Sequence, residues 1–200
     1  CTYNGDNTAP VCNLPPLVAL GASTGGPKAL VEVLSPLPQD FPGAVVVIQH
    51  VDALFSDGLG EWLGDQITLP VRLAKEGDRP QAGQVLVARS HKHLVVNGAR
   101  TLVYTDDPED CLYHPSVDAF FNSAARYWPK PGAGALLTGM GRDGADGLLA
   151  LRQAGWFTLA QDEATSVVDG MPKAARELDA AELVLPLPNI APAIMRRVSP

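Results

Sequence analysis

Cysteine is scarce in this sequence. Only Cys1, Cys12 and Cys111 occur among its 200 residues. They do not form the closely spaced pairs that are typical of metal sites, and an odd number cannot be fully paired within one chain. A disulfide-stabilised scaffold is therefore excluded, and we expect the protein to work in a reducing cytoplasm.

Long apolar runs and an excess of positive charge are also lacking. No stretch approaches the roughly 20 apolar residues of a membrane span, and no basic, then apolar, then small-residue leader opens the chain. The formal net charge is -7 and the isoelectric point is about 5.0. Because nucleic-acid binding needs a concentrated basic surface, we predict neither a nucleic-acid partner nor membrane insertion.

Apolar residues are abundant enough for one sizeable core, since 46% of the residues are hydrophobic and 18% are charged. The opening stretch "CTYNGDNTAPVCNLPP" mixes polar residues, glycine and proline without periodicity, and it does not begin with methionine. This composition predicts that residues 1–16 are the remnant of an interdomain linker. We expect a single domain over residues 17–200.

Continuous apolar runs indicate strands that are buried on both faces of a sheet. Residues 17–22 ("LVALGA") and 44–50 ("AVVVIQH") are such runs, and a helix-length segment separates them, as in a parallel βαβ unit. Residues 84–88 and 93–105, the latter with an Asn-Gly turn, favour short hairpin strands. After residue 114, helical and strand patterns alternate again. The predicted fold class is therefore α/β, a doubly wound three-layer α/β/α domain whose mostly parallel sheet carries an antiparallel hairpin insertion or edge.

Three residues with catalytic chemistry follow predicted strands. Ser23 follows the first strand, His50 ends the second, and Asp143 comes after the strand predicted at 134–138. In open parallel sheets, ligands bind beyond the carboxyl ends of the strands, where the strand order reverses. If the first strand lies between the other two, the three side chains meet over one crevice. A serine needs an imidazole to take its proton, and a carboxylate keeps that imidazole in the required tautomer, so this set predicts acyl transfer.

The loop around Ser23 supports this hypothesis but has other interpretations. Residues 21–25 match G-x-S-x-G, in which small flanking residues permit a tight turn that exposes the serine oxygen. The N–H of Thr24, at a helix N-terminus, could stabilise an oxyanion. Serine is also a common helix N-cap, which would make Ser23 purely structural. A phosphate loop is a weaker alternative, because the Lys-Ser/Thr pair of a P-loop is missing.

Residues 139–144 ("GMGRDG") offer a competing function. They fit the G-x-G-x-x-G dinucleotide fingerprint after a strand, and Asp162 ends the next strand at about the ribose-binding distance. Against this interpretation, the charge of Asp143 would oppose a pyrophosphate at the helix N-terminus. Asp146 is the alternative to Asp143 as the carboxylate beside His50.

The remaining histidines raise the alternative of a metal site. His91 and His93 flank Lys92, so in a strand both would point to the same face, and His114 could supply a third ligand. No further ligand spacing supports this arrangement, and we predict no metal.

Five ordered motifs resemble a known family. The segments "GASTGG", "VIQHV", "HPSVD", "LLTGMGRDGADG" and "AQDEATSVVDGMP" are similar to the catalytic domain of the bacterial chemotaxis receptor methylesterases, the CheB family. The likeness covers residues 17 to about 198. It implies an α/β domain with Ser23 as nucleophile, His50 as base and Asp143 as carboxylate. It also implies hydrolysis of glutamyl methyl esters on chemoreceptors, with release of methanol, and often deamidation of receptor glutamines.

The resemblance further implies what surrounds this triad. Thr24 and Met140 match motif positions that line the site, and His114 begins "HPSVD", so these three are expected to provide oxyanion or substrate contacts. No metal or organic cofactor is expected. The implied partners are the helical bundle of a methylated chemoreceptor and a phosphorylatable N-terminal receiver domain in the full-length chain. The segments "VARSHKHLVV" and "QHVDALFS" depart from the usual pattern, which leaves open whether the pathway is flagellar chemotaxis or a related sensory system.

Overall fold

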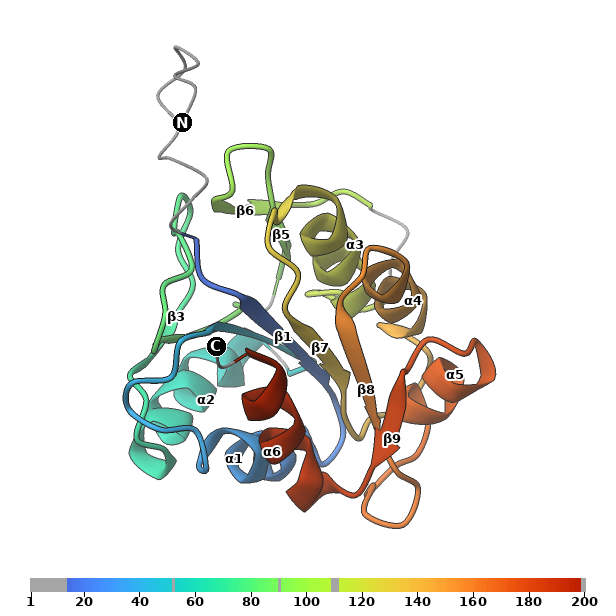
Figure 1. Cartoon of the computed structure of the whole chain (residues 1–200). Coiled ribbons are helices and arrows are strands. Elements are labelled where there is room, and N and C mark those ends of the chain that lie inside the picture. The colour runs from blue at the N-terminus through green and yellow to red at the C-terminus, as the bar shows by residue number, and fades with distance from the viewer. Residues whose placement is uncertain (1–13, 52, 90, 109–111, 199–200) are drawn as a thin grey trace.

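The computed structural model describes residues 14–51, 53–89, 91–108 and 112–198. Within this part of the chain, seven strands form one parallel sheet in the order β3-β4-β2-β1-β7-β8-β9 (Figure 1). The three cysteines and most of the predicted linker lie outside the described residues, so the boundary at residue 17 stays a prediction. The strands are β1 (Leu17–Ala22), β2 (Ala44–Gln49), β3 (Val71–Leu73), β4 (Val85–Val87), β7 (Ala133–Leu136), β8 (Phe157–Gln161) and β9 (Leu183–Leu185).

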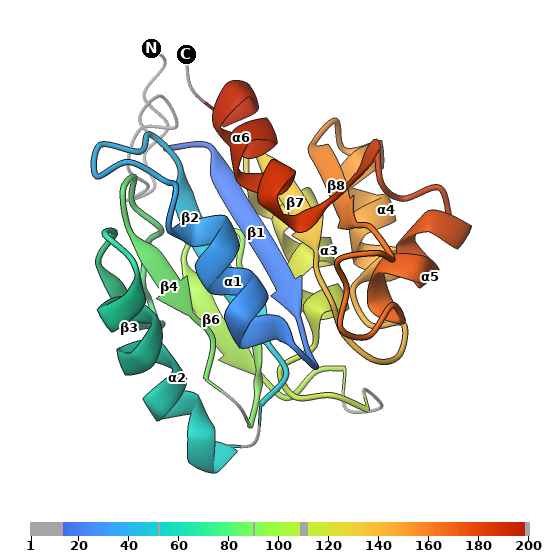
Figure 2. The same cartoon turned by 90° about the horizontal axis from the view of Figure 1, so that it is seen from below.

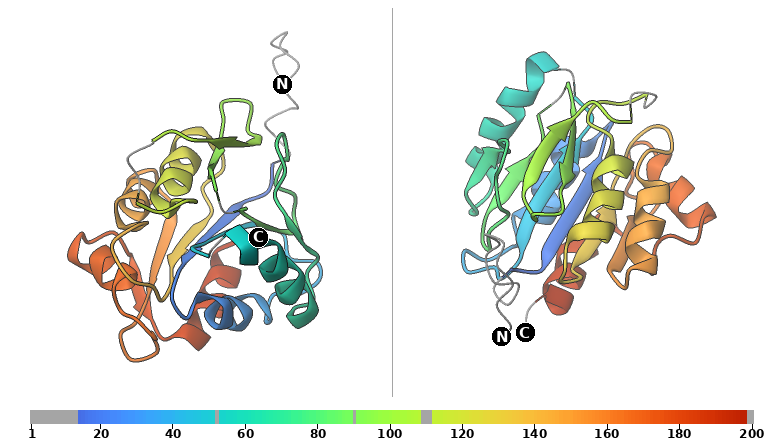
Figure 3. Two further views of the ribbon diagram at one scale, coloured as in Figure 1. Left: turned by 180° about the vertical axis from the view of Figure 1, so that it is seen from behind. Right: turned by 90° about the horizontal axis from the view of Figure 1, so that it is seen from above.

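Helices cover both faces of this sheet. On one face lie α1 (Gly26–Leu34), α2 (Ala53–Gln66) and α6 (Leu187–Val198), which are nearest the viewer in Figure 2. On the other face lie α3 (Val117–Tyr127), α4 (Ala145–Gln153) and α5 (Met171–Glu177), together with a hairpin (Figure 3). The predicted three-layer α/β/α fold is confirmed. No described helix is long and apolar enough to cross a membrane.

The alternation of β1 side chains explains its continuous apolar sequence. Leu17 and Ala19 belong to the core under α3 and α4, whereas Val18 and Leu20 belong to the core under α1 and α6. All four are at most 1% exposed. Because successive side chains of a strand point to opposite faces, a sheet covered on both faces requires apolar residues at every position.

The predicted hairpin is confirmed for one of its two segments. Strands β5 (His93–Val96) and β6 (Leu102–Thr105) pair antiparallel and form a separate two-stranded sheet. The hairpin interpretation of residues 84–88 is wrong, because β4 pairs parallel with both β2 and β3. Short apolar strands look alike in sequence whichever partner they have, so only the tertiary pairing distinguishes the two cases.

The strand order reverses beside β1. The chain proceeds from β1 to β2, then to the edge strand β3, then to β4 between β3 and β2, and later places β7 on the other side of β1. Loops from neighbouring strands diverge at such a reversal and leave a crevice at the carboxyl ends. The segments that carry Ser23, His50 and Asp143 therefore converge at this end of the sheet.

Candidate active site

Ser23 lies in a tight turn between β1 and α1. Its backbone N–H donates to Thr138 O of the neighbouring β7 loop at 3.0 Å, and its carbonyl accepts from Gly26 N at 2.8 Å. The N-cap of α1 is Gly25, in a left-handed conformation and without a side-chain cap hydrogen bond. The N-cap interpretation of Ser23 is therefore wrong, and its half-buried hydroxyl has no helix-capping role.

Gln49, the last residue of β2, ties this turn to His50. Its side-chain Nε2 donates to the carbonyl oxygens of both Ser23 and His50, each at 2.8 Å. Gln49 is 2% exposed, and these two bonds satisfy its buried NH₂ group, whereas its Oε1 is buried without a hydrogen-bond partner among the described residues. A Cβ on Gly26 would lie 2.0 Å from Gln49 Oε1, so only glycine leaves room for this amide. The backbone positions of Ser23 and His50 are thus held together by one side chain.

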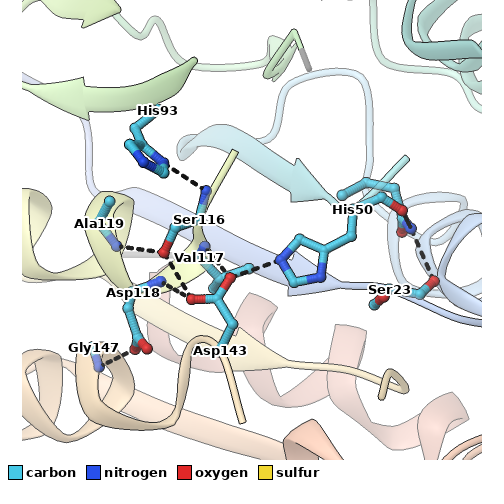
Figure 4. A network of polar contacts seen from close by, with 10 residues as sticks. Ser23, His50, His93, Ser116, Val117, Asp118, Ala119, Asp143 and Gly147 are labelled. Carbon is cyan, nitrogen blue, oxygen red and sulfur yellow. Dashed lines mark hydrogen bonds and ion pairs between the residues drawn. The ribbon is translucent and has the colours of Figure 1, made fainter. Parts of the chain in front are cut away.

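His50 and Asp143 form the closest polar contact between the candidate residues. His50 Nε2 lies 2.7 Å from Asp143 Oδ2, and the two side chains are only 7% and 9% exposed. The other ring nitrogen, Nδ1, is buried and has no hydrogen-bond partner within the described residues. Figure 4 shows Ser23 on the side of the imidazole away from Asp143. The ring therefore has a carboxylate on one nitrogen and an available nitrogen on the side of the serine.

The N-terminus of α3 holds the Asp143 carboxylate. Oδ2 also accepts from Val117 N at 2.7 Å, while Oδ1 accepts from Ser116 Oγ at 2.7 Å and from Asp118 N at 3.0 Å. Burial alone would raise the pKa of Asp143, but the bond from His50 and the three bonds from α3 hold that pKa below its ordinary value. Asp143 is thus an acceptor only, and Nε2 of His50 must carry the proton between them.

Asp118 makes the reciprocal contact to α4. Its Oδ1 accepts from Gly147 N at 2.6 Å, in the first turn of α4, while its own N–H donates to Asp143 at the entrance of the same helix. Burial and then the nearby charge of Asp143 raise the pKa of Asp118 to about 6, although the Gly147 N–H opposes the change. The N-terminus of α3 therefore binds the Asp143 carboxylate, and the N-terminus of α4 binds the Asp118 carboxylate. These two contacts fix the loop that bears Asp143.

His93 supports the same segment from the hairpin. Its Nδ1 accepts from Ser116 N at 3.0 Å, its Nε2 donates to Pro108 O at 3.1 Å, and burial lowers its pKa. His93 is therefore neutral, with both nitrogens engaged in hydrogen bonds. The His114 ring stacks on it at a centroid distance of 4.4 Å.

Comparisons with known proteins relate this chain to one family. The sequence profile of the CheB methylesterase family matches residues 18–194. The chain belongs to the CheB methylesterase family. It is 54% identical to protein-glutamate methylesterase/protein-glutamine glutaminase 1 of Bordetella avium, over 92% of this chain and 54% of that protein. It is also 54% identical to a protein of the same description, numbered 2, from Cupriavidus metallidurans, over 93% of this chain and 55% of that protein.

A solved structure of the CheB family is also similar. The Thermotoga maritima CheB methylesterase catalytic domain superposes with a TM-score of 0.84 at 31% identity, covering 91% of this chain and 98% of that one. By contrast, the chain spans about half the length of the curated relatives it matches.

Thr24, Met140 and His114 are the residues expected to line a CheB-type site. Thr24 is exposed, and its carbonyl accepts from Thr138 Oγ1 at 2.9 Å. Met140 is exposed and follows Gly139, whose added Cβ would lie 2.7 Å from Ser23 Cβ. His114 is exposed and stacks on His93 rather than on His50. Their oxyanion or substrate contacts stay predictions.

The structure does not support the two alternative sites, the metal site and the dinucleotide site. His91 precedes β5 with a φ of 120°, so it does not share a strand face with His93, and the described residues contain no group of three potential ligands placed to hold a metal. In the dinucleotide alternative, the N–H groups of Gly139 and Gly147 would face phosphate, but they donate to Val168 O and to Asp118. The Asp162 carboxylate accepts from Thr165 N and Oγ1 within its own turn.

Several supporting residues are absent from the sequence-based prediction. Gln49 directly precedes His50 at a strand end, and Ser116 and Asp118 lie within the quoted "HPSVD" motif, so position offered a signal for these three. Asp146 is exposed and makes no described contact with His50, which leaves Asp143 as the carboxylate there. For Tyr113, which stacks on His50, nothing in the sequence pattern indicates a role.

Proposed function

We propose that this chain is the catalytic part of a protein-glutamate methylesterase, with protein-glutamine glutaminase activity, acting on bacterial chemoreceptors. Ser23 is the nucleophile, His50 the general base and Asp143 the carboxylate that orients it. The observation that carries this proposal is the His50 ring, with Nε2 2.7 Å from Asp143 and a buried, unpartnered Nδ1 among the described residues. Such a ring is ready to accept one proton on the side of Ser23.

The tautomer sets the direction of proton transfer. Because Asp143 accepts the proton of Nε2, the lone pair lies on Nδ1 and is available to the Ser23 hydroxyl. In the trypsin-like triad the two nitrogens have the opposite roles, with Nδ1 on the aspartate. The chemistry is unchanged by this exchange, since both ring nitrogens become donors in the imidazolium and the charge is shared between them.

The reaction then proceeds by acyl transfer in two steps. His50 takes the Ser23 proton as the hydroxyl oxygen attacks the ester carbonyl, and returns it to the departing methoxide, which leaves as methanol. Water, deprotonated by the same imidazole, hydrolyses the glutamyl-serine ester. With a glutamine substrate, ammonia leaves in place of methanol. The N–H of Thr24, directly after the nucleophile, is the proposed oxyanion donor.

Exposed apolar side chains support a protein substrate. Leu112, Met140 and Val167 are 85%, 61% and 71% exposed. Leu112 precedes Tyr113, which stacks on His50. Met140 follows Gly139, which lies close to Ser23, and Val167 lies against Gly25. Exposed apolar residues grouped around a catalytic centre fit a partner surface such as a helix of a receptor bundle. Met140 and His114 are the proposed substrate contacts.

The family relationship supports the rest of the proposal. The chain spans about half the length of its curated relatives, so we assign the remaining part to a phosphorylatable receiver domain, joined through residues 1–16. The receptor bundle and the receiver domain are then its partners, and the cytoplasm its location. No metal or organic cofactor has a step in this mechanism.

Methanol release from methylated receptor membranes tests the proposed function, with unmethylated membranes as the blank. We expect Ser23→Ala to lose turnover by thousands-fold or more, because the nucleophile is gone, while its melting temperature stays close to that of the parent. Ser35→Ala, at the exposed far end of α1, is the matched control and keeps full activity. A correctly folded Ser23→Ala with parental turnover refutes the assignment of the nucleophile.

A further inference from the structure

Tyr113 lies face to face with the proposed base. The Tyr113 and His50 ring centroids are 4.3 Å apart, and the ring planes differ by only 5°. The phenol ring therefore covers one face of the imidazole. The two imidazole nitrogens lie along the edge of the imidazole ring, where this stack leaves them accessible to hydrogen bonds. None of the hydrogen bonds of the triad passes through Tyr113, so the mechanism described above does not use it.

Contacts on several sides hold Tyr113 in this position. The neighbouring His114 stacks on His93, so consecutive residues of one segment stack on two different histidines. The hydroxyl end of Tyr113 lies close to Gly141, since a Cβ added to Gly141 would lie 3.0 Å from Tyr113 Oη. Gly141 has a φ of +87°, a conformation that favours glycine, and it brings the backbone of the Asp143 loop against the phenol. The tyrosine therefore contacts both the base and the loop of the carboxylate.

We infer that Tyr113 is a positioning residue that stabilises the imidazolium of His50 during the reaction. This inference rests on the proposed function. The face of an aromatic ring carries negative potential, which attracts a cation above it but has little effect on a neutral ring. His50 is a cation only after it has taken the serine proton, so the attraction strengthens in the transition state. The same stack restricts rotation of the imidazole, which keeps Nε2 on Asp143 and Nδ1 on the serine side.

The inference predicts a specific difference between two substitutions. Tyr113→Phe keeps the aromatic face, so we expect its kcat to stay within about twofold of the parent. Tyr113→Leu keeps an apolar but smaller side chain over the imidazole and removes the aromatic face. Its kcat should fall by about two- to thirtyfold with little change in KM, the range expected from a cation–π contact. Tyr127→Leu, the same change at the exposed end of α3, is the control and keeps parental kcat.

Two assays make the outcome independent of the receptor substrate. Methanol release measures turnover, and the rate of Ser23 labelling by a fluorophosphonate measures attack by the serine alone. A parental kcat and labelling rate for Tyr113→Leu overturns the inference, and so does an equal loss in the Phe and Leu variants, which would assign the effect to the hydroxyl. If Tyr113→Leu melts below the assay temperature, Tyr113→Met replaces it in the same comparison. A parent that labels but releases no methanol refutes the proposed function, while the labelling rates still test Tyr113.

Discussion

Replacing Asp143 by asparagine tests the centre of the proposed mechanism. The change keeps the shape of the side chain but replaces one acceptor oxygen with an NH₂ donor. Oδ2 accepts from His50 Nε2 and Val117 N, and Oδ1 accepts from Ser116 Oγ and Asp118 N. The new NH₂ therefore faces two former donors whichever way the amide turns.

The favoured orientation of the asparagine follows from these partners. With the NH₂ on the Oδ1 side, the Ser116 hydroxyl can rotate and accept from it, whereas the Asp118 N–H loses its acceptor. One unsatisfied buried N–H costs about 1–3 kcal/mol of the free energy of unfolding. The amide oxygen still accepts from His50 Nε2, so the imidazole keeps its tautomer and the variant remains folded.

The loss of charge has a larger effect on the rate. At the 2.7 Å separation of His50 Nε2 and Asp143 Oδ2, a carboxylate stabilises an imidazolium by about 6 kcal/mol with an effective dielectric constant of about 20. Both side chains are less than a tenth exposed, so water screens this attraction weakly. We expect kcat to fall by about four orders of magnitude with little change in KM.

Methanol release gives kcat and KM, and urea unfolding gives the stability of each variant. Asp146→Asn is the matched control, because Asp146 is exposed in the first turn of α4, three residues from Asp143. It should keep parental activity and a free energy of unfolding within about 0.5 kcal/mol of the parent. A folded Asp143→Asn with kcat within tenfold of the parent, or an inactive Asp146→Asn, refutes the assignment of the carboxylate.

Two further predictions concern the support of the site. The pKa of Asp118 is raised to about 6, so the folded state binds its proton more tightly than the unfolded chain, and the contribution of Asp118 to stability falls as pH rises from about 4 to 6. Asp118→Asn should remove this slope in urea unfolding and gain up to about 3 kcal/mol at pH 8, and an unchanged slope contradicts it. Gly26→Ala should displace the Gln49 amide and cost about 1–3 kcal/mol with reduced turnover, whereas Gly98→Ala, in open space, should be silent in the same melting and activity assays.

The sequence predicted strands correctly where the local apolar pattern reflects burial in the tertiary structure. The apolar runs at 17–22 and 44–50 are parallel strands because both of their faces are covered, and continuous apolar sequence is the direct consequence of that burial. The pattern failed at residues 84–88, where a short strand joins the parallel sheet and not a hairpin. The alternative in which Ser23 caps α1 is also wrong, because the N-cap is Gly25 in a left-handed conformation.

Sequence alone determined the fold class, and it predicted that the segments carrying Ser23, His50 and Asp143 follow strands that end at one edge of the sheet, because burial and strand direction require no knowledge of any contact. Only the tertiary structure decided how they are held. His50 and Asp143 lie 93 residues apart, and their contact depends on the N-terminus of α3, which binds the carboxylate. Side-chain direction between distant segments also decided three other contacts. These are the bond of His50 Nε2 to Asp143, the bonds of the Gln49 side chain to the carbonyl oxygens of Ser23 and His50, and the stack of Tyr113 on His50. No local periodicity encodes such directions, since packing between segments selects them.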